Sequence, residues 1–241
     1  MKFNRYLPEL IKEKAKKIVG TPKPEPPIPT TPRTSEYILL PGRNHGSYSY
    51  PDLLVGMQRE YQGSNWNEAH THLHSTNYFM LNLRQTADLL HDLHTGTLYD
   101  ETGTQLSSSI VQELLNDMIQ VRDPWRAEWI DAQFQKKGEL WTISYDHRTK
   151  NGILTPERIE TLEACMMQDQ FPGIDLQNWI QKATIQGMPA TTTTNGSMYY
   201  WGPKDNTVAG LDANSYGVSL YCDRDPPNSY SALGVRKARL K

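Results

Sequence analysis

Apolar residues recur at helical spacing in three stretches of the chain. Over residues 1–20 an apolar stripe is flanked by lysines elsewhere on the helical wheel, and Gly20 is a natural stop. The same spacing predicts helices over residues 86–94 and 108–121, and the serines at 107–109 are suited to cap the second. We therefore expect one basic amphipathic helix at the N-terminus and two helices in the body.

The rest of the body alternates between short aromatic pieces and turn residues. Residues 143–145 and 198–201 have the composition of short strands. Asn-Gly pairs at 151–152 and 195–196 and a Pro-Gly pair at 172–173 predict turns. Helices early and strands late predict an α+β fold with short helices and short, irregular antiparallel strands.

A proline-rich segment divides the chain. Thr21–Thr34 contains six prolines, a density that favours extended polyproline II and predicts a semi-rigid spacer. The chain therefore divides into a helix at 1–20, a linker at 21–36 and a domain at 37–241. Because a lone short helix is marginal in water, we expect residues 1–20 either to anchor on a partner or a membrane surface or to fold back on the domain.

Composition and charge narrow the class of protein. The net charge is -2, which argues against a nucleic-acid partner. No apolar run is long enough to span a membrane, and residues 1–17 lack the apolar core of a signal peptide. Two cysteines, Cys165 and Cys222, make no disulfide framework, and whether they pair stays open. We predict neither a cofactor nor a bound metal. The final location of the protein stays open, and a virion or cell surface is one of the possibilities.

The C-terminal segment resembles a known family. Its frame is Trp201, Ala213-Asn214-Ser215, Leu220, Cys222, Pro226, Ala232-Leu233-Gly234-Val235-Arg236 and Ala238-Arg239. With this frame, residues 199–239 resemble the variable region of diversity-generating retroelement variable proteins, above all the archaeal and archaeal-virus members. That family uses the C-type lectin fold, in the branch shared with formylglycine-generating enzymes. Residues 40–52, 66–74 and 122–129 are similar to its upstream body.

The resemblance implies a diversified surface. In that family AAY codons become NNY, which never encodes Lys, Glu, Gln, Met or Trp, and none of these five types occurs from Asp205 to Arg236. Tyrosines in this segment offer rigid contacts, and its Ser, Asn, Asp and Gly offer adaptable ones. The expected ligand-facing positions are Gly210, Asp212, Tyr216, Gly217, Val218, Tyr221, Asp223, Asp225, Pro227, Asn228 and Tyr230. The implied function is non-enzymatic display toward a protein or cell-surface ligand, with a fixed lectin-like module as one alternative.

A metal-dependent enzyme is the other alternative. His70, His72 and His74 alternate, and on a strand they would share one face that can bind zinc. No carboxylate or cysteine follows at a recognised ligand interval, so we expect satisfied or solvated histidines. Neither cysteine has a nucleophile signature, and the cysteine pair and copper site of formylglycine-generating enzymes are not reproduced here. Asp123, Glu128 and Asp131 instead predict a structural knot, with Arg122 and Arg126 as salt-bridge partners.

Overall fold

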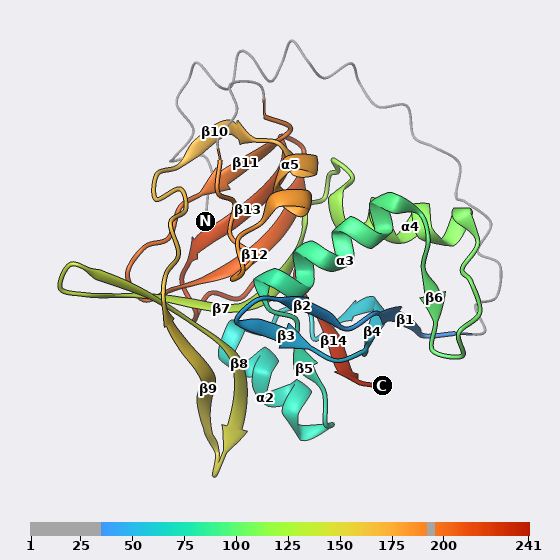
Figure 1. The fold of residues 1–241 in the computed structure, drawn as a ribbon, viewed down its shortest axis with the longest axis horizontal. Coiled ribbons are helices and arrows are strands. Elements are labelled where there is room, and N and C mark those ends of the chain that lie inside the picture. The colour runs from blue at the N-terminus through green and yellow to red at the C-terminus, as the bar shows by residue number, and fades with distance from the viewer. Residues whose placement is uncertain (1–34, 192–195) are drawn as a thin grey trace. The chain divides into compact units, whose positions relative to one another are not determined.

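The computed structural model describes residues 35–191 and 196–241 (Figure 1). The predicted helix at 1–20, the linker up to residue 34 and Asn195 of the second Asn-Gly pair lie outside these residues. Ser35–Lys241 forms one compact unit. Within the described residues, no helix is both long and apolar enough to cross a membrane.

Four helices lie in this part of the chain, and polar caps set where they begin. The helices are α2 (Trp66–Ser75), α3 (Leu83–Thr95), α4 (Ser108–Ile119) and α5 (Leu176–Lys182). Asn65 and Asn82 each accept a hydrogen bond from the backbone three residues on, and Glu68 and Gln85 reciprocate, which makes two capping boxes. Ser107 caps α4, as predicted. The two helices expected in the body are therefore confirmed, although α3 begins three residues earlier than predicted.

The strands form a twelve-stranded mixed sheet and a separate two-stranded hairpin of β2 and β3. Nine strands of the large sheet lie in the order β10-β11-β13-β12-β7-β14-β4-β1-β6. Of the remaining three, β5 pairs with β14, β8 pairs with β7, and β9 pairs with β8. The strands are β1 (Tyr37–Leu40), β2 (Arg43–His45), β3 (Tyr48–Tyr50), β4 (Leu53–Glu60), β5 (Phe79–Met80), β6 (Tyr99–Asp100), β7 (Arg126–Lys137), β8 (Leu140–Lys150), β9 (Ile153–Thr161), β10 (Gln170–Ile174), β11 (Met198–Trp201), β12 (Thr207–Asn214), β13 (Gly217–Arg224) and β14 (Leu233–Leu240).

This architecture is α+β, but three expectations about its strands were wrong. β7 and β8 are 12 and 11 residues long, and β11/β13 and β14/β7 pair in parallel. The Pro172-Gly173 pair makes no turn: it lies inside β10, where the register with β11 shifts. The Asn151-Gly152 pair does connect β8 to β9, and both residues have positive φ, as a tight hairpin requires.

Strand β7 connects the two halves of the large sheet. Its first residues pair with β12 on one side and with β14 on the other. Its later residues pair with β8 in place of β14, and β8 in turn pairs with β9 in a hairpin (Figure 1). Helix α3 packs against α4, α5 and β7, while α2 packs against β8 and β14. Any group on β7 therefore lies close to elements far apart in sequence.

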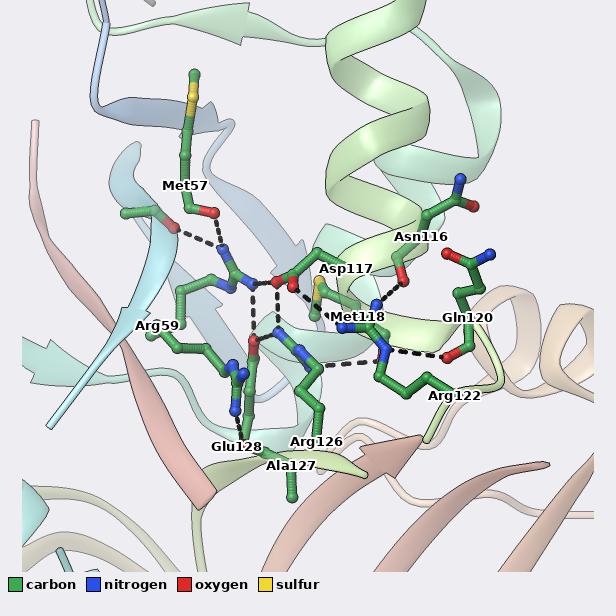
Figure 2. A network of polar contacts seen from close by, with 12 residues as sticks. Met57, Arg59, Asn116, Asp117, Met118, Gln120, Arg122, Arg126, Ala127 and Glu128 are labelled. Atoms are coloured by element: carbon green, nitrogen blue, oxygen red, sulfur yellow. Dashed lines mark hydrogen bonds and ion pairs between the residues drawn. The ribbon is translucent and has the colours of Figure 1, made fainter. Parts of the chain in front are cut away.

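A network of buried charges lies where β7 meets β14 (Figure 2). Glu128 accepts from Arg126 and from Arg236, the latter at 2.7 Å, and all three side chains are nearly inaccessible to solvent. Asp117 on α4 bonds the same two guanidiniums, at 2.7 and 3.1 Å. The predicted salt-bridge knot is thus confirmed for Glu128 and Arg126. Its third member, Arg236, is far away in sequence, and no spacing pattern suggested it.

Two more arginines extend the network to the backbone. Arg59 donates to the carbonyl of Ala127 and Arg122 to that of Asn116, both at 2.9 Å (Figure 2). Arg59 also donates to the carbonyl of Ala232 at 2.6 Å. Burial alone would raise the pKa of Glu128, but the charges of Arg126 and Arg236 outweigh it and lower that pKa to about 2. Glu128 is therefore ionised throughout the neutral range.

Glu128→Gln should lower the free energy of unfolding by about 3–5 kcal/mol, because it leaves two buried guanidiniums short of a counter-charge. Since the folded pKa lies below the unfolded one, this stabilisation is complete above about pH 4.5 and is lost as the pH falls toward 2. Urea denaturation at several pH values measures it. The matched control Glu139→Gln, at an exposed position, should cost less than about 0.5 kcal/mol. Equal costs for both variants would contradict a structural role for the network.

Candidate functional site

The outer face of the C-terminal part of the sheet carries a row of aromatic side chains. On β11, Met198 and Tyr200 are buried in the core, so Tyr199 and Trp201 lie on the opposite face and stay half-exposed. The parallel register of β11 and β13 sets Trp201 beside Tyr221, and their rings stack at 5.4 Å with an angle of 5°. Phe171 on β10 contacts the Trp201 ring edge-on at 4.6 Å.

Arg224 continues this row across the sheet. Its guanidinium lies 4.1 Å from the centre of the Tyr221 ring and 5.9 Å from that of Trp125. The same group forms an ion pair of 2.9 Å with Asp212 on β12. Gly210 makes room for it, since a Cβ at that position would lie 3.1 Å from the Arg224 side chain. The lack of a side chain at position 210 therefore helps to hold the arginine flat against the strand.

Trp125 and Tyr230 end the row, with ring centres 5.7 Å apart and an edge-on geometry. We call this set the aromatic row, and its members in spatial order are Phe171, Trp201, Tyr221, Arg224, Trp125 and Tyr230. All the aromatic members are half-buried. Rigid rings exposed on one face of a sheet can bury area on a partner at low entropic cost.

Acidic side chains border the aromatic row. Asp223 forms an ion pair of 2.6 Å with the exposed Lys204, and burial raises the pKa of Asp223. Asp225 is exposed at the start of the turn that leads to Tyr230. This surface therefore combines apolar area with groups that favour a cationic or hydrogen-bonding partner.

The predicted ligand-facing residues fall into three groups by exposure. Tyr216, Asp225 and Pro227 are exposed, and half-buried positions are Gly217, Tyr221, Asp223, Asn228 and Tyr230. Gly210, Asp212 and Val218 are buried, which corrects the expectation that they face a ligand. Gly210 and Asp212 lie beneath Arg224, whereas Val218 packs in the core.

Several members of the aromatic row were missed as contact residues. Phe171 and Trp125 lie outside the variable-like segment 199–239, and Trp201 was assigned only to its frame. The available sequence signal was Tyr199 and Trp201 at alternate positions of the predicted strand 198–201, since two such residues share a face. Phe171 gave no such signal, because its strand is irregular.

The three alternating histidines lie on helix α2, not on a strand, which corrects the expected geometry. On a helix, residues four apart share a face, so His70 and His74 lie together with ring centres 5.4 Å apart. His72 points elsewhere, is exposed, and stacks on Tyr61 at 4.9 Å. In the described residues, one group of His, Cys, Asp or Glu side chains has ligand atoms close enough together for a metal ion: His70, Asp131 and His147.

Neither cysteine has the properties of a nucleophile. Both are free, and Cys222 is fully buried in the core. Burial raises the pKa of Cys165 to about 11, and that of Cys222 well above its usual range. Both thiols are therefore protonated at neutral pH, whereas a nucleophilic cysteine needs its thiolate.

The chain has no match among protein-family models, curated proteins or solved structures.

Asp212 should make stability depend on pH. Burial raises its pKa to about 6, against the opposing effect of Arg224. Because the folded pKa exceeds the unfolded one, the fold favours the protonated form, and stability falls as the pH rises from about 4 to 6. Relative to Asp212→Asn, the wild-type protein should lose about 3 kcal/mol over this interval. Denaturation profiles that stay parallel from pH 4 to 7 would contradict this assignment.

Proposed function

We propose that this chain is a non-enzymatic ligand-binding protein whose contact surface is the aromatic row with its acidic border. We further propose that it is a diversity-generating retroelement variable protein with a C-type lectin fold. The carrying observation is that β10, β11 and β13 expose stacked aromatic rings on one face while their other face builds the core. Interfaces use such rings as anchors.

The C-terminal segment separates scaffold from surface, which supports display. Leu211, Leu220 and Cys222 are fully buried in the core of β12 and β13. By contrast, the turn around Tyr216 and the segment 225–230 are mostly exposed or half-buried. Substitutions in these two segments therefore alter the surface at little cost to folding. A diversified protein needs this division.

The chemistry of the surface favours a protein or cell-surface ligand. Aromatic area with carboxylates around it suits a polypeptide that offers apolar and basic groups. A nucleic acid would be repelled by the exposed Asp225, and the net charge of -2 gives the chain no overall attraction to phosphates. Residues 1–20 and the linker are proposed to attach this domain to a partner or membrane surface.

Two alternatives make different predictions. A fixed lectin-like module would use the same surface for one ligand, so its exposed residues would be the same in every copy of the gene. An enzyme would need a reactive group open to substrate, but both thiols are protonated and His70 is fully buried. The burial of these groups favours binding over catalysis.

The deciding experiment for the family is to sequence the DNA next to this gene. A near-copy of the segment that encodes residues 199–239, with AAY codons at the exposed positions and a reverse transcriptase nearby, would establish diversification. A locus without either would leave a fixed binding module as the function.

A codon library tests the separation of scaffold and surface in the protein itself. With NNY codons at Tyr216, Asp225 and Asn228, most variants should stay folded, with melting temperatures within about 5 °C of wild type, because these side chains lack core contacts. The matched control places the same codons at Leu211, Leu220 and Cys222, where most variants should unfold. Protease resistance of the displayed libraries, read by sequencing, measures both. Equal survival of the two libraries would refute the proposed separation.

A further inference from the structure

Three buried side chains converge where helix α2 meets strands β7 and β8. His70 comes from α2, Asp131 from β7 and His147 from β8. Their side chains are 0%, 1% and 2% exposed. The sequence gives no hint of this group, because the three residues are separated by 61 and 16 positions (131 − 70 and 147 − 131). The packing of α2 on β8 and the pairing of β7 with β8 bring them together.

The group has the geometry of a ligand set. Asp131 Oδ1 lies 2.5 Å from His147 Nδ1 and 3.5 Å from His70 Nε2. One ligand atom from each residue lies within 4.8 Å of the other two. The backbone N–H of His147 donates to Asp131 Oδ2 at 2.9 Å, which fixes the carboxylate and leaves Oδ1 directed at the imidazoles. Small shifts of the rings would bring the three atoms around one ion.

The polar atoms of the buried His70 ring are unsatisfied. Neither of its ring nitrogens has a hydrogen-bond partner in the described part of the chain, although the ring is fully buried. Buried polar atoms are almost always satisfied, by protein, water or an ion. Trp66 presents its ring to His70 at 4.3 Å and to His147 at 5.0 Å, so one side of the group is walled by an apolar ring. His70 is therefore held beside the carboxylate with its bonding capacity unused.

We propose that His70, Asp131 and His147 bind a divalent transition-metal ion of the zinc class. Two imidazoles and one carboxylate are a donor set typical of zinc, whereas calcium and magnesium prefer oxygen alone. Because the ligands come from α2, β7 and β8, a bound ion would link α2 to the β7–β8 pair and give His70 its missing partner. His74, whose buried Nε2 also lacks a partner among the described residues, lies beside His70 but outside the set of mutually close atoms.

This site differs from the expected histidine row and is independent of the proposed function. Of the three alternating histidines it uses His70 and not His72. It adds two ligands from distant strands, and it involves no catalytic step. The competing interpretation is a metal-free group in which Asp131 bonds His147 and only attracts His70.

Metal binding by the untagged, chelator-treated full chain tests the proposal. Titration with Co²⁺ should give visible absorption bands that saturate at one ion per chain and disappear on addition of Zn²⁺. Elemental analysis after desalting should find one Zn²⁺ per chain. A hundredfold excess of Zn²⁺ over its Kd should raise the melting temperature by about 5–10 °C.

Variants assign the ligands. His70→Gln and His147→Gln should each lower the affinity for Co²⁺ at least tenfold and reduce the Zn²⁺-dependent rise in melting temperature to about half or less. The matched control His72→Gln lies on the same helix at an exposed position and should bind like wild type. X-ray absorption of the Zn²⁺-loaded wild-type chain should show two imidazole ligands, a measurement that needs no folded variant. Absence of stoichiometric binding in the wild type, or binding by His70→Gln equal to wild type, would overturn the proposal.

Discussion

Two guanidiniums buried against one carboxylate constrain the rest of this structure. Arg126 and Arg236 are 110 positions apart (236 − 126), and each alone would be costly to bury. Glu128 compensates both, so β7 and β14 must meet in one register for either arginine to be inside. Hydrophobic packing tolerates many arrangements, whereas a buried ion pair with its partner removed costs several kcal/mol. The network thus selects one pairing of the strands that connect the two halves of the sheet.

Strand β7 carries this constraint to both sites. Three residues beyond Glu128 the same strand supplies Asp131 to the histidine group, and on its other side it pairs with β12, which carries Asp212. Four members of the aromatic row, Phe171, Trp201, Tyr221 and Arg224, lie on strands β10, β11 and β13, which reach β7 through β12. Strand β7 therefore sets the positions of a charged core, a buried histidine group and the aromatic row.

Sequence reasoning succeeded where the signal was local. Helical periodicity located α3 and α4, a serine marked the start of α4, and Asn151-Gly152 marked a hairpin turn, because each depends on residues a few positions apart. It failed where structure depends on distant pairing. Alternating histidines can lie on a strand or on a helix, so their spacing did not decide between the two. No local pattern connects His70 with Asp131, or Arg126 with Arg236. Burial of Asp212 and Val218 followed from the sheet, which the segment alone did not reveal.

The ion pair of Arg224 and Asp212 has a consequence for the diversification proposed for this surface. Under the proposed diversification, independent changes at both positions would in many combinations leave one buried charge without its opposite and lower the stability of the variant. The number of useful variants is then smaller than the number of codon combinations, and the surviving sequences should show correlated residues at these two positions. If the proposed function holds, the counter-charge beneath the aromatic row limits which variants fold, and the least adaptable part of the surface is the part that supports its aromatic rings.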